Sequence, residues 1–115
     1  MGDITFYEGN GASQDIVCTL NDTAGQRVNC KDHDDCENDE ARSCLLRNVR
    51  ANAVIRVYDS PSGDKDDDWT EITVLRTHPE YTVRTFEKNL EDVYVRIVHH
   101  HNNGLDGKVS RIEID

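Results

Sequence analysis

Two stretches of this sequence resemble each other and decide the expected fold: residues 4–11 read ITFYEGNG, and residues 55–63 read IRVYDSPSG. Each begins with Ile, reaches a Tyr that is followed by an acidic residue, and then runs into turn-forming residues. Alternating apolar residues are typical of a strand with one buried face, and the Gly, Asn, Ser and Pro residues predict a tight turn. The sequence therefore contains the same strand and turn twice, 51 residues apart.

A second phrase is also repeated, in which an acidic residue is followed four places later by Ser and then by aliphatic residues. It reads NDEARSCLL at 38–46 and LDGKVSRIEI at 105–114. Ser43 and Ser110 lie 67 residues apart, so the second copy is about 16 residues longer than the first. Taken alone, residues 38–49 have apolar residues at helical spacing. The repeat instead favours a strand after each Ser.

The rest of the chain is also rich in strand signals and poor in helix signals. Runs of Val, Ile, Thr and aromatic residues are separated by Gly, Pro, Asn and Asp. These runs are DIVCTL (15–20), TEITVL (70–75), YTVRTF (81–86) and VYVRIVHH (93–100). With 115 residues, the chain is long enough for one modest core. We therefore expect a single all-β domain, a sandwich or a barrel.

The repeated phrases resemble the βγ-crystallin superfamily, specifically its calcium-binding microbial members. They are also similar to the crystallin-like domain of calcium-dependent cell-adhesion proteins. The resemblance covers nearly the whole chain and implies two Greek-key motifs that form a β-sandwich. The single domain would span residues 1–115, with one motif at about 3–50 and the other at about 51–115.

The resemblance also implies one or two Ca²⁺ sites, in each of which the closing loop of one motif meets a hairpin carbonyl of the other. Ca²⁺ takes 6–8 oxygen ligands, so two loops supply more of them than one. The implied ligands are the hairpin carbonyls of Glu8 and Asp59 and the side chains of Asp39, Ser43, Asp106 and Ser110. The family's final Ser is Cys44 in one copy and Arg111 in the other. Binding weaker than in the best family members is therefore expected.

Net charge and hydropathy limit the classes of partner that the chain is expected to bind. The formal net charge is −10, which opposes binding to nucleic-acid phosphates. No apolar run is long enough to insert into a membrane. No signal peptide is visible, and we expect the mature form of a secreted or extracellular monomer. Its expected partners are calcium ions and a protein or cell-surface partner.

The four cysteines, Cys18, Cys30, Cys36 and Cys44, contain no C-x-x-C spacing, which disfavours a zinc or thioredoxin-type site. An even number of cysteines in a small acidic domain favours two disulfides. The preferred pairing is Cys30–Cys36 with Cys18–Cys44. The alternative is four reduced thiols in a cytosolic protein.

The acidic runs and a pair of histidines are two further candidate metal sites. The acidic runs at 31–40 and 59–71 do not follow the EF-hand pattern and are interpreted mainly as solvated loops. His99 and His101 would share one face of a strand and could hold Zn²⁺ or Ni²⁺ with one further ligand. The preferred interpretation is that these histidines simply occupy a strand end and a turn.

Catalysis is not expected. The chain has no Gly-x-Ser-x-Gly motif, and the best acid–base pair, Asp68 with His78 or Glu71, has nothing to hold it in place. Trp69 is expected to pack rather than to bind a ligand. The alternative to a calcium-binding module is a small secreted proteinase inhibitor or killer-toxin-like protein, in which a loop of the second motif would act.

Overall fold

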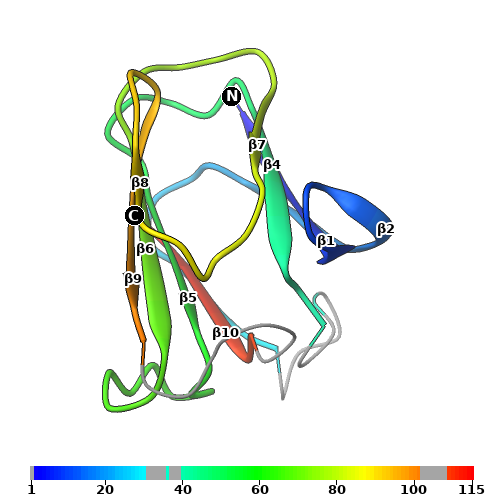
Figure 1. Ribbon diagram of the computed structural model, residues 1–115, viewed down its shortest axis with the longest axis vertical. Helices are drawn as coiled ribbons and strands as arrows, with labels where there is room; N and C mark the ends of the chain where they lie inside the picture. The colour runs from blue at the N-terminus through cyan, green and yellow to red at the C-terminus, as the bar shows by residue number, and fades with distance from the viewer. Residues whose placement is uncertain (1, 31–35, 37–39, 102–108) are drawn as a thin grey trace.

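The computed structural model describes residues 2–30, 36, 40–101 and 109–115. Within these residues the chain forms ten β-strands and no helix, so no helix in this part could cross a membrane. The strands are β1 (Asp3–Gly9), β2 (Ser13–Asn21), β3 (Gln26–Asn29), β4 (Ser43–Arg47), β5 (Val54–Tyr58), β6 (Trp69–Val74), β7 (Tyr81–Val83), β8 (Leu90–Glu91), β9 (Val95–His100) and β10 (Arg111–Ile114). They form two antiparallel sheets that face each other (Figure 1), which confirms the predicted all-β sandwich.

The two halves of the chain have matching strand arrangements. The smaller sheet has the order β2-β1-β4-β7, and the larger sheet has the order β3-β10-β5-β6-β9-β8. The repeated phrases form β1 and β5, and each of these lies between the strand that follows it and the last strand of its half. The third strand of each half, β3 or β7, joins the opposite sheet. The β8–β9 hairpin has no equivalent in the described residues of the first half, and it accounts for the longer second repeat.

The stretch with helical spacing becomes strand β4, as the repeat predicted. β4 pairs with β1 on one side and with β7 on the other. Four of its five residues are buried, which requires both faces to be covered. Burial of this kind overrides the weak local preference for a helix.

The core is formed by the inward-facing side chains of both sheets. In the larger sheet one row crosses four strands in register, and every member is at most 5% exposed. This row consists of Ile114, Ile55, Ile72 and Ile97. Ile4 and Phe6 of β1 face it from the smaller sheet and are fully buried. Each such side chain contributes about 1.5–3 kcal/mol through burial.

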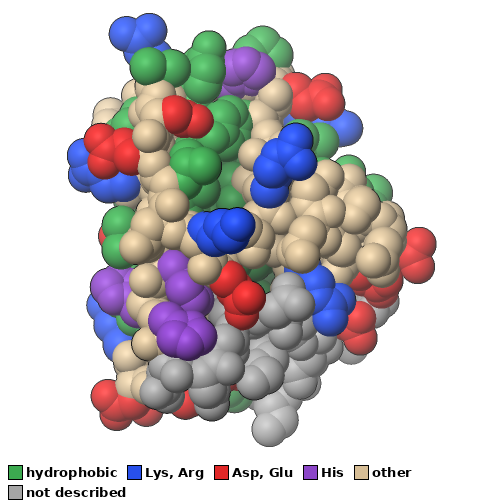
Figure 2. Space-filling model, viewed as in Figure 1, with side chains coloured by type: hydrophobic (Ala, Val, Ile, Leu, Met, Phe, Trp, Pro, Cys, Tyr) green, Lys and Arg blue, Asp and Glu red, His purple; other side chains and the backbone are tan. Residues whose placement is uncertain are grey.

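The connection from β7 to β8, residues 84–89, runs between the two sheets (yellow in Figure 1). It places Phe86 in the core, where the side chain is 2% exposed and packs against Phe6, with the two ring centroids 6.2 Å apart. Beside this connection, hydrophobic side chains remain visible in a hollow on the face shown in Figure 2. The connection therefore fixes one end of the core and borders a surface depression.

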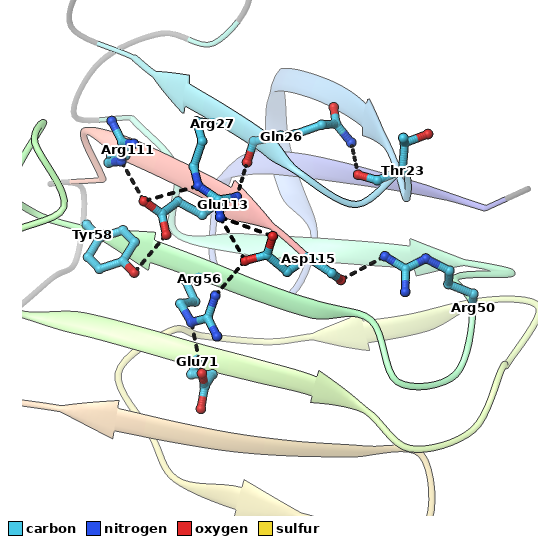
Figure 3. Close-up of polar contacts among 10 residues, drawn as sticks. All are labelled: Thr23, Gln26, Arg27, Arg50, Arg56, Tyr58, Glu71, Arg111, Glu113 and Asp115. Atoms are coloured by element: carbon cyan, nitrogen blue, oxygen red, sulfur yellow. Dashed lines mark hydrogen bonds and ion pairs between the residues drawn. The ribbon is translucent and has the colours of Figure 1, made fainter.

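Charged side chains on the outer face of the larger sheet link β3, β10, β5 and β6 (Figure 3). Asp115 accepts hydrogen bonds from Arg27 and Arg56, and Glu113 accepts one from Arg111. Burial raises the pKa of Glu113, but the hydrogen bond from Arg111 and the neighbouring positive charges outweigh it and lower the pKa. Arg56 also donates to Glu71 of β6 at 2.9 Å. Single exposed ion pairs contribute little, so the value of this network lies in joining four strands.

The predicted disulfide pairing is wrong, because the structure joins Cys18 to Cys36. Phe6 of β1 is in register with both Cys18 of β2 and Cys44 of β4. Two strand spacings therefore separate Cys18 from Cys44 by about 10 Å, whereas a disulfide bridges Cα atoms no more than about 7 Å apart. Cys30 and Cys44 are both buried, and burial raises the pKa of the Cys44 thiol.

Peptide mapping without reduction should recover a fragment that links Cys18 to Cys36. Cys36→Ser should lower the free energy of unfolding by about 3 kcal/mol, because the bridge closes a loop with a sequence separation of 18. Urea denaturation measures this difference. A reductant should destabilise the wild type by a similar amount and leave the variant unchanged, whereas a Cys30–Cys36 fragment would contradict the structure.

A buried carboxylate ties the N-terminus to the connection between β4 and β5. Asp22 is 3% exposed, and its Oδ2 atom accepts hydrogen bonds from the backbone N–H groups of Gly2 at 3.2 Å and Arg50 at 3.0 Å. Burial raises the pKa of Asp22, but these hydrogen bonds and the charge of Arg50 outweigh it and lower the pKa. The ionised form is therefore the one that stabilises the fold.

Because the folded pKa of Asp22 is lowered, its stabilisation is present above the unfolded pKa near 3.9 and is lost as the pH falls through the folded pKa. Asp22→Asn should lower the free energy of unfolding at pH 7 by about 1–3 kcal/mol. The difference from the wild type should shrink at pH 3, as measured by urea denaturation at both pH values. A difference that is independent of pH would contradict this account, and Asp15→Asn on the exposed face of β2 is the control.

Candidate metal centre

The register between β6 and β9 brings three potential metal ligands together at one end of the larger sheet. Thr70 pairs with His99, so Asp68 and His101 are neighbours two positions further along the two strands. Side chains alternate between the faces of a strand, which places Asp68, His99 and His101 on the same side as Thr70. The predicted common face of His99 and His101 is confirmed, since their rings lie 5.7 Å apart.

The three ligand atoms are close enough for one ion. Oδ2 of Asp68 lies 3.8 Å from Nε2 of His99 and 3.6 Å from Nδ1 of His101, and all three atoms lie within 4.8 Å of one another. Ligands of a tetrahedral Zn²⁺ at about 2.0–2.1 Å from the metal lie roughly 3.3 Å apart. The His101 side chain is 67% exposed and has room to close the small excess. Histidine side chains gather at this end of the sheet in Figure 2.

The tautomer of His99 is fixed by its neighbours. A hydroxyl group has a single proton, and Thr70 donates it to the carbonyl oxygen of Phe86 at 2.5 Å. The contact of 2.8 Å between Oγ1 of Thr70 and Nδ1 of His99 must therefore be one in which the imidazole donates. In the neutral ring this leaves Nε2 with an unprotonated lone pair.

That lone pair is buried and faces an acidic side chain. Nε2 of His99 has no hydrogen-bond partner among the residues that the structure describes. Its distance of 3.8 Å from Asp68 is too long for a hydrogen bond. Burial lowers the pKa of His99, and the nearby Asp68, which raises it, does not outweigh burial. Two acceptor atoms therefore face each other across a gap that a metal cation fits.

On the opposite face of the same strands, aromatic rings form a stack. Trp69 lies between Tyr58, with ring centroids 5.8 Å apart, and His100, with centroids 4.1 Å apart. Both neighbouring rings are nearly parallel to the indole, and the ammonium group of Lys65 lies 4.7 Å from its centroid. The expected packing role of Trp69 is thus supported. As the single Trp of the chain, it also provides a fluorescent reporter next to Asp68.

The first-half residues of the predicted calcium site contact their own hairpin. Ser43 is fully buried, donates from its hydroxyl to the carbonyl of Gly9 at 2.5 Å and accepts from the N–H of Ala12 at 2.9 Å. The carbonyl of Glu8 accepts a hydrogen bond from the guanidinium of Arg42 at 2.9 Å. The positively charged guanidinium group of Arg42 therefore already lies on one side of this carbonyl oxygen.

The second-half residues are held through their backbones. The N–H of Asp59 donates to the carbonyl of Asp68, and the N–H of Ser110 donates to the carbonyl of Tyr58. Asp39 and Asp106, the acidic members of the predicted site, lie outside the described residues. The calcium assignment therefore stays a prediction.

The interpretation of the acidic run at 59–71 as a solvated loop is wrong for Asp68. Asp64, Asp66 and Asp67 are exposed, but Asp68 is fully buried. Buried residues alternate with less buried ones along β6, at Val74, Ile72 and Thr70. Continued by two residues, this alternation indicates that position 68 is buried as well. The density of acidic residues around it hid this periodicity.

No family model, no curated protein and no solved structure matches the chain. Its function must therefore be inferred from the chemistry of the site.

Long-range ¹H–¹⁵N NMR at neutral pH should show His99 protonated on Nδ1 and bare on Nε2. Thr70→Val should abolish this preference and lower the free energy of unfolding by about 1–3 kcal/mol, because the Phe86 carbonyl loses its donor. Thr73→Val, on the other face of β6, should leave the tautomer unchanged. Protonation of Nε2 in the wild type would refute the assignment.

Proposed function

We propose that this chain is an extracellular metal-binding module whose main site holds a divalent transition metal on Asp68, His99 and His101. The observation that carries the proposal is the buried Nε2 atom of His99, which has no hydrogen-bond partner among the described residues and lies 3.8 Å from Oδ2 of Asp68. Metal-binding histidines commonly donate their other ring N–H to an oxygen, which fixes the ring. The contact from His99 to Thr70 supplies that interaction.

The ligand types favour the zinc class over calcium at this site. Two imidazole nitrogens and one carboxylate suit Zn²⁺, Ni²⁺ or Cu²⁺, whereas Ca²⁺ requires 6–8 oxygens. Three protein ligands also leave a fourth position of a tetrahedral ion for water or for a group from a partner. An extracellular setting is supported by the Cys18–Cys36 disulfide, since such bonds persist in oxidising compartments.

Calorimetry of chelator-treated protein with Zn²⁺ should show one site per chain. Asp68→Asn and His101→Ala should each remove most of the affinity, since each takes away one of three ligands. His100→Ala is the matched control, because His100 stacks on Trp69 on the opposite face, and it should bind like the wild type. Ni²⁺ or Cu²⁺ should also quench Trp69 fluorescence.

Equal losses in His100→Ala and His101→Ala would contradict the proposal. That result would indicate loose chelation by neighbouring histidines rather than binding at a built site.

We also propose a Ca²⁺ site at the closing loops, as the resemblance to calcium-binding βγ-crystallins implies. Two observations favour it. The strand arrangement of each half fits a duplicated Greek key in which the third strand pairs with the other sheet. The hydroxyl of Ser43 also donates to the Gly9 carbonyl, which brings the closing strand of the first half against its hairpin.

Calcium at 100 times its Kd should stabilise the fold by about 2.7 kcal/mol. Ser110→Ala should reduce this stabilisation, as measured by thermal denaturation with and without Ca²⁺. Asp68→Asn should not affect it, because Asp68 belongs to the other site. An equal calcium shift in Ser110→Ala and the wild type would exclude Ser110 as a ligand.

A further inference from the structure

The hollow between the two sheets arises because the sheets differ in width. The larger sheet has six strands and the smaller has four, so β9 and β8 extend beyond the edge strand β7. At this overhang the structure contains a cavity of about 240 Å³. In Figure 2 it is visible as a hydrophobic depression with Lys and Arg side chains at its rim.

The floor of the hollow is apolar. Val83 of β7 and Ile97 of β9 are buried, and Tyr81 is half-buried. Leu90 of β8 is in register with Ile97 and therefore faces the same side of the sheet. Leu90 nevertheless remains 45% exposed, since no strand of the smaller sheet lies opposite β8. An apolar surface of this kind gains free energy when a hydrophobic group covers it.

The rim of the hollow is positively charged, in contrast to the chain as a whole. Arg84 and Lys88 line it, and the carboxylate of Asp92 beside it accepts a hydrogen bond from the hydroxyl of the lining residue Tyr81. Within the described part of the chain neither cation forms an ion pair. The backbone of Arg84 is held in place, because its carbonyl accepts a hydrogen bond from Gly11 of the β1–β2 hairpin at 2.8 Å.

We propose that this hollow binds a small amphiphilic anion, a single apolar chain or ring with a carboxylate or sulfate group. The apolar part would cover Leu90 and Ile97, and the acidic group would pair with Arg84 and Lys88. Charge-assisted hydrogen bonds from Arg and Lys are the strongest that a protein offers to such groups. The volume is below the usual range for drug-sized ligands, so one short chain fits it better than a complete lipid.

Decanoate is a suitable probe, used below its micelle concentration and measured by calorimetry in the presence of a chelator. The chelator prevents the carboxylate from binding through a metal at Asp68. The wild type should bind decanoate, and it should not bind decyltrimethylammonium, which carries the same chain and the opposite charge.

The double variant Arg84→Gln/Lys88→Gln should bind decanoate about tenfold more weakly or worse. Arg47→Gln/Arg76→Gln removes the same number of exposed charges away from the hollow and should bind like the wild type. Leu90→Asn should weaken binding with the charges intact.

The assignment would be overturned by an absence of decanoate binding, by equal affinity for decanol, or by equal losses in the two double variants. Analytical ultracentrifugation provides a further test. A dimer that dissociates in Leu90→Asn would make a second copy of the chain the occupant and would also overturn the proposal.

Discussion

The single proton of the Thr70 hydroxyl is the constraint on which the proposed metal site depends. Once the carbonyl of Phe86 takes that proton, the imidazole of His99 must donate from Nδ1 and present a bare Nε2 atom. The ring cannot rotate away, because its side chain is 94% buried. Oδ2 of Asp68 faces this atom at 3.8 Å, and a carboxylate oxygen is a second ligand type for the same ion. Packing of the core thus orients two of the three proposed ligands, whereas the third, His101, is 67% exposed.

Both proposed binding features depend on the β8–β9 hairpin, which the second half of the chain has in addition to the shared strand plan. β9 supplies His99 to the metal centre and Ile97 to the hollow, and β8 supplies Leu90. The connection before β8 serves both as well, since Phe86 fixes Thr70 and Arg84 lines the hollow. The strands shared by the two halves therefore provide the scaffold and Asp68, and the additional hairpin and its connection provide the other groups of the two proposed sites.

The sequence predicted the fold well, because burial on one face imposes a period of two and the repeat reveals equivalent strands. Ile4 and Ile55 were recognisable as equivalent for this reason, and Ser43 could be assigned to a strand against its local helical spacing. The cysteine pairing failed because it depends on which strands are adjacent. β1 separates Cys18 from Cys44, and no local pattern contains that information.

Only two of the three ligands of the proposed metal centre could be predicted from the sequence. Strand alternation placed His99 and His101 on one face, but the third ligand required the β6–β9 register, which places Asp68 opposite His101, far along the chain. Asp68 was also obscured by the acidic residues beside it.

A crystal soaked in Zn²⁺ and measured at the zinc absorption edge tests the central claim most directly. The account predicts an anomalous peak about 2.0–2.2 Å from Nε2 of His99, Nδ1 of His101 and a carboxylate oxygen of Asp68. A peak elsewhere on the chain with nothing between these three atoms would contradict it.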